Sequence, residues 1–353
     1  MPAVGRTPAS TTQQIVVDAT ANSSVPAIKP TRRTRSDRAA KAPRQPDVLG
    51  KEGGMDSSDH LSPYATPKAT REVLERHGLY TKYALGQNFL VNDDIIRKIV
   101  ELADLQPDDR VLEVGPGIGT LTAALLKCSS YVTSIEMDYD LPEVLADTLA
   151  PWAERFTLLR MNALDLEIND FPSDQFSKLP NKLVSNLPYA VAATIALGYF
   201  QRFDFLDSAT VMVQREVAER MMARPGTKTY GAYTVKLSMY AQAAGCFPVS
   251  STNFFPPPRV ESTVIRLDRV PSHDEMGREL TSEELQAVCT MADAAFANRR
   301  KTVSNSCKIF FSDRPDIVER LPEVFERADI DPRRRGETLA QREFIQLGLA
   351  YLS

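Results

Sequence analysis

The sequence predicts an α/β fold, in which a mostly parallel sheet carries helices on both faces and is followed by a small all-α domain. Short apolar runs typical of buried strands alternate with helical runs through the middle of the chain, which is the pattern of a doubly wound sheet. After Pro271 the pattern is helical to the end. A length of 353 residues leaves room for both domains.

The elements can be placed in order along the chain. Residues 69–77 predict a short helix that ends before Gly78, a residue that suits a left-handed C-terminal position. Asn92 predicts the start of a helix over 93–105, because its side chain can cap the first turn. Strands are expected at 110–114, 131–135, 156–161, 182–185 and 209–213, with a late edge strand at 262–267. The C-terminal helices are expected at 282–296, 300–310, 317–327 and 339–349.

The N-terminal part of the chain has a composition that cannot bury a core. Residues 1–66 are rich in Ala, Pro, Ser, Thr and Arg without a hydrophobic period, which predicts a disordered extension. Met55 opens a stretch that leads into structured sequence, so one hypothesis is that translation begins there, which an intact-mass measurement of the native protein would test. The predicted domains are then this extension, an α/β domain over 67–270 and a helical domain over 275–353.

Composition and charge exclude several classes of function. The net charge is −4, and residues 1–54 carry nine Lys or Arg against four Asp or Glu, so the rest of the chain is acidic and net charge gives no support to RNA binding. No apolar run is long enough for a transmembrane helix, so no membrane partner is expected. Four dispersed Cys and three His disfavour a metal site and a Ser-His-Asp mechanism. The simplest compartment is the reducing cytoplasm.

A glycine loop between a strand and a helix predicts a cofactor site. Gly115 and Gly117 allow the backbone to approach a ligand closely. Their spacing, G-x-G-x-G with Pro116 inside, differs from the G-x-G-x-x-G of dinucleotide sites and suits the methionine part of S-adenosylmethionine. Glu136 ends the next strand, where a carboxylate can bind both ribose hydroxyls. The sheet is therefore expected to be a Rossmann-like, S-adenosylmethionine-dependent methyltransferase sheet.

The tetrapeptide Asn186-Leu187-Pro188-Tyr189 follows an apolar run that predicts a strand. The Asn186 side-chain oxygen and the Leu187 carbonyl can accept the two hydrogens of an exocyclic amine, and Tyr189 can stack on the ring that carries it. This arrangement suits methyl transfer to a nucleobase amino nitrogen. Taken alone, the tetrapeptide is also compatible with an ordinary turn, since Asn and Pro are common turn residues.

Five ordered blocks resemble the small-subunit ribosomal RNA adenine N6,N6-dimethyltransferases of the KsgA type. They lie at residues 85–90, 113–119, 186–189, 255–260 and 295–302. The resemblance implies dimethylation of adenine N6 on two adjacent adenosines near the 3′ end of small-subunit (16S) rRNA, coupled to maturation of the subunit. It also implies that the partners are the small ribosomal subunit and its rRNA, and that the enzyme is a cytoplasmic monomer.

The resemblance also assigns donor contacts by motif. It places Asn88, Leu90 and Gly115 against the donor, Glu136 at its ribose and Asn186 at the edge of its pocket. Where the family usually has an Asp-Ala pair that binds the adenine amine of the donor, this chain has Asn162-Ala163. Asn162 can still accept from the amine but lacks the negative charge that strengthens such a bond, and Asp165 could substitute for it.

The resemblance further implies residues for the RNA. Phe254 and Phe255 are expected to cover the base, although edge-strand core residues are the alternative. Arg299, Arg300 and Lys301 are expected to open a C-terminal helix and to dock on the subunit in preference to a later cluster at 333–335. Charge runs are otherwise usually solvated surfaces.

Two other functions are compatible with the same motifs. One is a large-subunit rRNA adenine methyltransferase of the macrolide-resistance type, against which Leu187 and the 295–302 block argue. The other is a non-catalytic relative, such as a mitochondrial transcription factor or a ribosome-assembly checkpoint, against which the intact tetrapeptide and glycine loop argue.

Overall fold

The computed structural model describes residues 60–81, 87–172 and 179–353. Residues 1–59 of the extension expected over 1–66 lie outside these ranges, as do the hypothetical start at Met55 and Leu85 and Gly86 of the first resembling block.

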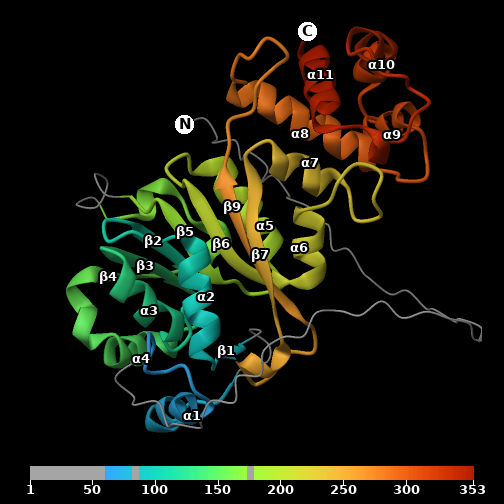
Figure 1. The fold of residues 1–353 in the computed structure, drawn as a ribbon. Coiled ribbons are helices and arrows are strands. Elements are labelled where there is room, and N and C mark those ends of the chain that lie inside the picture. The colour runs from blue at the N-terminus through green and yellow to red at the C-terminus, as the bar shows by residue number, and fades with distance from the viewer. Residues whose placement is uncertain (1–59, 82–86, 173–178) are drawn as a thin grey trace, which may run out of the picture. The chain divides into compact units, whose positions relative to one another are not determined.

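Seven strands form one sheet in the order β4-β3-β2-β5-β6-β9-β7 (Figure 1). The first five strands in this order run parallel, and β9 runs antiparallel to both β6 and β7. The strands are β2 (Arg110–Val114), β3 (Tyr131–Glu136), β4 (Phe156–Arg160), β5 (Lys182–Asn186), β6 (Ser208–Gln214), β7 (Ala241–Val249) and β9 (Ser262–Arg269). The predicted parallel sheet is confirmed, and β9 and β7 are added at one side by antiparallel pairing.

The late strand was wrongly expected at the edge of the sheet. β9 lies between β6 and β7. Its apolar residues are buried in the clusters on the two faces of the sheet, Ile265 and Leu267 in one and Val264 in the other. The edge strand is β7, which the pattern of the sequence does not reveal. It is rich in Ala and contains Gly245 and Pro248, residue types that are depleted in strands, and only its first and last residues are buried.

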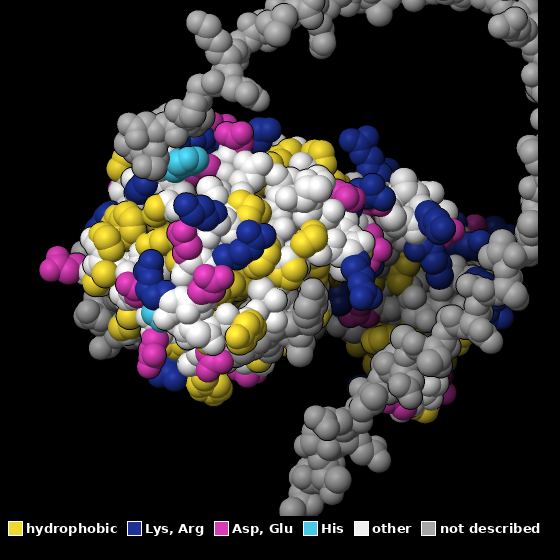
Figure 2. Space-filling view, turned by 90° about the horizontal axis from the view of Figure 1, so that it is seen from below, with side chains coloured by type: hydrophobic (Ala, Val, Ile, Leu, Met, Phe, Trp, Pro, Cys, Tyr) yellow, Lys and Arg dark blue, Asp and Glu magenta, His cyan; other side chains and the backbone are white. Residues whose placement is uncertain are grey.

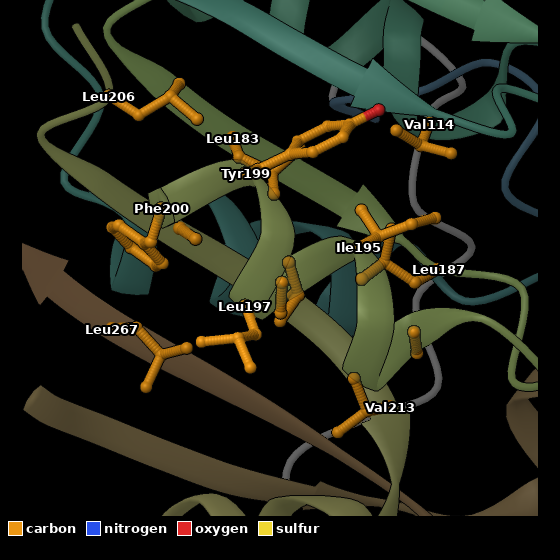
Figure 3. Close-up of a cluster of buried hydrophobic side chains, with 14 of the residues drawn as sticks. Val114, Leu183, Leu187, Ile195, Leu197, Tyr199, Phe200, Leu206, Val213 and Leu267 are labelled. Atoms are coloured by element: carbon orange, nitrogen blue, oxygen red, sulfur yellow. The ribbon is translucent and has the colours of Figure 1, made fainter. Parts of the chain in front are cut away.

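Different helices cover the two faces of the sheet. Successive side chains of a strand point in opposite directions, so neighbours in one strand pack against different helices. Leu183 of β5 belongs to the cluster packed against α5, whose Tyr199 and Phe200 are buried (Figure 3). Its neighbour Val184 belongs to the cluster formed with α2 and α3. The helices of this domain are α2 (Asp93–Ala103), α3 (Thr120–Cys128), α4 (Leu141–Thr148), α5 (Ala192–Arg202), α6 (Arg215–Met221) and α7 (Ala232–Ser238).

The cap predicted at Asn92 is confirmed. Its side-chain oxygen accepts a hydrogen bond of 2.9 Å from the Asp94 backbone N–H, and α2 begins at the intervening residue. The preceding helix, α1 (Pro67–Arg76), is followed by Gly78 at φ +64°, the left-handed conformation expected there. Short 3₁₀ helices occur at Ala150–Arg155, Ala163–Asp165, Ile168–Asp170, Ser251–Asn253 and Gly336–Thr338. Among the helices of the described ranges, none combines the length and apolarity needed to cross a membrane.

The ordered chain begins before residue 66, where the sequence placed the end of the disordered extension. The carboxylate of Asp93 accepts hydrogen bonds from the backbone N–H groups of Leu61 and Ser62, at 3.0 and 2.8 Å. Ala65 is buried, and the Tyr64 hydroxyl donates to the Thr148 carbonyl at 2.7 Å. This segment is fixed by polar contacts to distant residues, which a local composition does not reveal.

Four helices make up the C-terminal domain: α8 (Ser282–Phe296), α9 (Val303–Phe310), α10 (Pro315–Arg327) and α11 (Gln341–Leu352). The helix expected from residue 300 begins at Val303, because Thr302 caps it by accepting from the Asn305 N–H. Tyr230, Val235 and other residues around α7 belong to the same buried cluster as this domain. The boundary expected at 270–275 therefore does not separate two independent cores.

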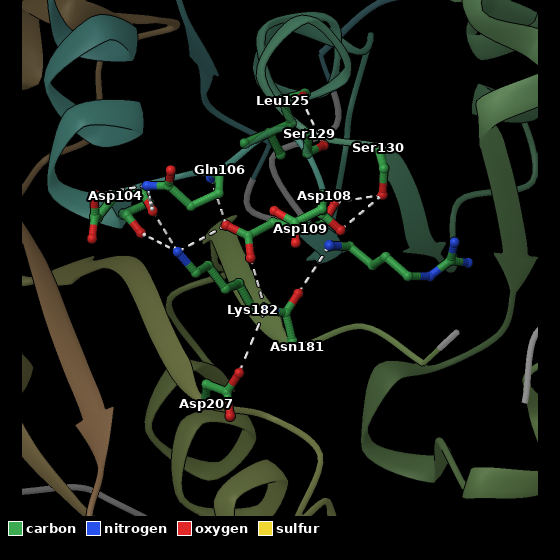
Figure 4. A network of polar contacts seen from close by, with 12 residues as sticks. Asp104, Gln106, Asp108, Asp109, Leu125, Ser129, Ser130, Asn181, Lys182 and Asp207 are labelled. Atoms are coloured by element: carbon green, nitrogen blue, oxygen red, sulfur yellow. Dashed lines mark hydrogen bonds and ion pairs between the residues drawn. The ribbon is translucent and has the colours of Figure 1, made fainter. Parts of the chain in front are cut away.

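A polar network consolidates the amino ends of the central strands (Figure 4). Asp109 pairs with the buried Lys182 at 2.8 Å and accepts from the Asn181 amide at 2.7 Å. Burial of Asp109 works against its ionisation, but hydrogen bonds from the Gln106 N–H, Lys182 and Asn181 hold its pKa below the ordinary value. The charged groups at this end of the sheet are thus engaged in structural contacts with one another. The cavity described next lies at the other end, where the parallel strands finish.

Candidate active site at the carboxyl ends of the strands

A cavity of about 500 Å³ lies at the carboxyl ends of the parallel strands. Its walls come from β1 (Phe89–Leu90), the loop after β2, the ends of β3 and β5, and the turn after β4. All the residues predicted to bind the cofactor or to act in catalysis line it: Asn88, Leu90, Gly115, Gly117, Glu136, Asn162, Asn186, Leu187, Pro188 and Tyr189. The structure therefore brings the residues predicted to bind the cofactor and the residues predicted to act in catalysis into one cavity.

The glycine loop is packed on both sides. Gly115 and Gly117 have φ values of +70° and +59°, which side-chain-bearing residues rarely adopt. A Cβ at Gly117 would stand 2.9 Å from Cε1 of Phe89, and one at Gly115 would stand 3.6 Å from Cγ of Pro188. The loop thus runs between β1 and the tetrapeptide, and its backbone forms the cavity wall.

Glu136 ends β3 and is only 8% exposed. One carboxylate oxygen accepts from the backbone N–H groups of Met137 and Asp138, both at 2.9 Å. Burial raises the pKa of Glu136, while the Asp138, Met137 and Gly117 N–H groups act in the opposite direction. These bonds fix the carboxylate against the glycine loop, in a position to accept hydrogen bonds from hydroxyl groups in the cavity.

Glu113 is a second carboxyl in the cavity wall, and no role was predicted for it from the sequence. One of its oxygens accepts from the Thr122 hydroxyl at 2.7 Å and the Ser134 hydroxyl at 2.8 Å. Burial raises its pKa to about 7, although these two bonds oppose the rise. The available signal was an acidic residue within the apolar run 111–114, two positions before Gly115. Glu113 ties β2 to β3 and to α3, and so supports the loop between them.

The tetrapeptide begins at the end of β5 and turns into α5. The Asn186 amide nitrogen donates to the Asn88 carbonyl at 3.2 Å, which leaves the side-chain oxygen for an amine. The N–H of the buried Leu187 donates to the Met212 carbonyl at 3.2 Å, and the Val191 N–H donates to the Pro188 carbonyl at 3.1 Å. The backbone of the tetrapeptide is therefore tied to β6 and closed by a turn.

The Tyr189 ring is partly buried, and its hydroxyl lies 2.5 Å from the hydroxyl of Ser262 at the start of β9. Burial raises the pKa of Tyr189, so it remains neutral at physiological pH. Ser262 carries no local sequence signal for this contact, since 73 residues separate it from Tyr189.

Asn162 lines the cavity, and its side-chain oxygen accepts from the Leu164 N–H at 3.1 Å, capping a short 3₁₀ helix. Asp165, the proposed substitute acceptor, is exposed and does not line the cavity. Among the described residues no three His, Cys, Asp or Glu side chains are grouped as metal ligands.

Comparison with known proteins decides the family. A family profile described as "Ribosomal RNA adenine dimethylase" matches residues 79–346. The chain belongs to this family. A "Ribosomal RNA small subunit methyltransferase A" from Enterococcus faecalis is 37% identical over 287 residues, which cover 81% of this chain and 95% of that protein. The protein of the same name from Staphylococcus aureus is 36% identical, over 80% of this chain and 94% of its own length.

Solved structures agree in fold. A dimethyladenosine transferase from Plasmodium falciparum has a TM-score of 0.60 and 22% identity, over 73% of this chain and 95% of that chain. The 23S rRNA methyltransferase ErmE has a TM-score of 0.54 and 22% identity, over 75% and 100% of the two chains. The predicted α/β methyltransferase fold, the enzyme class and S-adenosylmethionine as the cofactor of this dimethylase family are confirmed.

Several residues of this dimethylase predicted to meet RNA lie outside the cavity. β1 pairs with β8 (Phe254–Phe255), where Phe254 is buried in the core. The guanidinium of Arg71 lies 4.9 Å above the ring centroid of Phe255. Neither Phe is among the cavity-lining residues, so a role of Phe255 over the base stays a prediction.

The basic cluster lies in the turn between α8 and α9 and does not open a helix. Arg299 pairs with Glu337 at 2.8 Å and donates to the Thr227 carbonyl at 3.1 Å, so it braces the domain. Arg300 and Lys301 are exposed. On the face shown in Figure 2, Lys and Arg side chains are interspersed with Asp and Glu side chains. Any docking patch on that face is therefore local.

The later cluster has acidic partners of its own. Arg333 pairs with Asp331 at 3.1 Å, and Arg334 pairs with Glu343. These pairs leave less uncompensated charge there than at Arg300 and Lys301.

Proposed function

We propose that this protein dimethylates adenine N6 on two adjacent adenosines near the 3′ end of small-subunit (16S) rRNA, as a step in maturation of the small subunit. The observation that carries the proposal is that the glycine loop and the tetrapeptide form walls of one cavity. Gly115 lies so close to Pro188 that an added Cβ would be in van der Waals contact with it. A methyl donor on the loop and an amine at Asn186 would thus meet within a single site.

The residues present fit S-adenosylmethionine. The Gly115–Gly117 backbone offers a wall without side chains, Glu136 offers a fixed carboxylate for the ribose hydroxyls, and Asn162 offers an acceptor for the adenine amine. When bound, the cofactor supplies an electrophilic methyl group on a sulfonium.

The acceptor side of the site would activate the amine by hydrogen bonding. The N6 lone pair of adenine is delocalised into the ring and is a poor nucleophile. Acceptance of its two N–H hydrogens by the Asn186 side-chain oxygen and the Leu187 carbonyl favours a more tetrahedral nitrogen. Tyr189 would stack on the base, which must leave its helix to enter the cavity. The nitrogen becomes acidic once methylated, so the step needs no dedicated general base.

We also propose that the enzyme acts as a cytoplasmic monomer on precursor small subunits. Its rRNA substrate is available where subunits are assembled, and its four free cysteines suit a reducing compartment. Exposed Arg300 and Lys301 are the favoured phosphate contacts.

The decisive experiment is transfer of labelled methyl groups to precursor small subunits by the purified protein, with mass spectrometry of the rRNA. Two adjacent dimethyladenosines near the 3′ end are expected. Large subunits serve as the matched substrate, and methylation there instead would favour the macrolide-resistance type of enzyme. Binding of precursor subunits without methyl transfer would favour a non-catalytic assembly factor.

A further inference from the structure

Tyr189 is held at both ends of its side chain. Its backbone belongs to a loop tied to β6 by the bond from the Leu187 N–H to the Met212 carbonyl. Its hydroxyl lies 2.5 Å from the Ser262 hydroxyl, and one of the two groups donates to the other. The ring therefore spans from the tetrapeptide to the beginning of β9.

Ser262 is a firm anchor. It is fully buried and is the first residue of β9, paired with Gln214 on β6 and with Val249 on β7. A residue with a strand on each side cannot shift without disturbing both ladders (Figure 1). Loss of either hydroxyl would leave the other without this partner in a largely buried place.

The orientation of the ring should matter for the chemistry. A tyrosine side chain has only two rotatable bonds to its ring, and its hydroxyl lies on the axis of the second, so fixing the backbone and the hydroxyl together fixes the long axis and the centre of the ring. A base stacked on that ring takes its position from it, and small displacements of a reacting atom are costly in rate.

We propose that Ser262 is a positioning residue for methyl transfer, which sets the position of the Tyr189 ring and, through it, the position of the flipped adenine. Ser262 does not itself line the cavity, so it acts only through Tyr189. This inference rests on the proposed function.

A double-mutant cycle tests the inference. Ser262→Ala and Tyr189→Phe each remove one hydroxyl of the pair and should each lower kcat on precursor small subunits about tenfold, with little change in the Kd for S-adenosylmethionine. The double variant should be no slower than either single variant. Ser262→Thr, which keeps the hydroxyl, should restore most of kcat. Ser208→Ala is the matched control, since Ser208 is also buried but lies at the end of β6 away from Ser262.

Three outcomes would overturn the inference. The first is a double variant whose loss of kcat equals the product of the two single losses. The second is an unchanged kcat in Ser262→Ala. The third is a Ser262→Ala variant in which Tm and cofactor affinity fall together with kcat, because that pattern would indicate a purely structural role.

A readout that needs no catalysis separates this inference from the proposed function. In protein labelled with 3-fluorotyrosine, the resonance that Tyr189→Phe removes identifies Tyr189. Ser262→Ala should shift that resonance, and Ser208→Ala should not. A resonance that stays in place in Ser262→Ala overturns the positioning role, whereas a wild-type protein that transfers no methyl group overturns the proposed function.

Discussion

The ring of Phe89 occupies the space that a side chain at Gly117 would need, since a Cβ built there would stand 2.9 Å from Cε1 of Phe89. Phe89 belongs to β1, is buried, and packs with Leu74 of α1 and Ile118. The N-terminal helix therefore supports the cofactor loop through one aromatic ring.

Gly117→Ala should weaken binding of S-adenosylmethionine by tenfold or more. The left-handed backbone alone costs about 1–2 kcal/mol for a residue with a side chain, and the contact with Phe89 adds to this cost. Calorimetric titration measures the affinity. Gly277→Ala is the matched control, because Gly277 has φ +80° with no atom near the added Cβ. Equal losses of affinity in the two variants would contradict the role of the Phe89 contact.

Asn186→Ala should lower the rate of methyl transfer by about 100-fold or more, the typical effect of removing a hydrogen-bonding group from a reacting centre. Binding of the cofactor and of the small subunit should be largely retained, since the variant loses only one bond, to the Asn88 carbonyl. Labelled-methyl transfer and subunit pelleting measure the two properties. Asn181→Ala, just before the opposite end of β5, should reduce stability without changing the rate for the folded enzyme. Retained activity in Asn186→Ala would remove Asn186 from the mechanism.

Asn162→Asp should bind S-adenosylmethionine as tightly as the wild type or more tightly. A carboxylate can cap the Leu164 N–H as the amide oxygen does, and it adds a negative charge opposite the adenine amine. Calorimetry of the two proteins side by side is the measurement. A clear loss of affinity would show that residue 162 does not hold the amine.

Glu113 should make the protein less stable as the pH rises. Its pKa in the folded state, about 7, lies above the ordinary value of 4.5, so the native state binds the extra proton between these limits. The free energy of unfolding should therefore fall across this window and level off above it, by about 1–3 kcal/mol for this group. Glu113→Gln should flatten that part of the profile in urea titrations. An identical slope in both proteins would contradict the assignment.

The three residues of the basic cluster should separate into two roles. Arg299→Ala should lower stability by about 0.5–1 kcal/mol, because it loses Glu337 and the Thr227 carbonyl. The pair Arg300→Ala and Lys301→Ala should leave Tm unchanged, weaken subunit binding and reduce its salt dependence. Arg333→Ala is the control for an exposed arginine that already has an acidic partner. Unchanged subunit binding in the double variant would place the docking surface elsewhere.

The sequence predicted the elements whose signals are local. β2 has the predicted bounds, 110–114, and α2 begins after the Asn92 cap. β7 escaped prediction because its Ala, Gly and Pro residues carry no strand pattern, and it is held by pairing with β9. The bracing role of Arg299 depends on Glu337, which only the folded chain brings near.

The candidate site, too, combines residues that carry a local sequence signal with residues that do not. The glycine spacing and the tetrapeptide identified two walls of the cavity. The glycines are required by the backbone conformation of their loop, and the tetrapeptide has the residue types that suit amine binding. Ser262 and the full burial of Glu113 follow from contacts made across the sheet. Chain-distant contacts of this kind leave no local periodicity to recognise.

The core shared by α7 and the C-terminal helices restricts how this enzyme can be recombined with its relatives. The Tyr230 hydroxyl donates to the Leu339 carbonyl at 2.9 Å, and the Gly226 N–H donates to the Glu337 carbonyl at 2.7 Å. A chimera joined at residue 270 would place the α7 segment of one parent against the helices of the other. The natural unit of exchange therefore comprises two separate pieces of the chain, the segment from about residue 226 to the end of α7 together with the C-terminal helices.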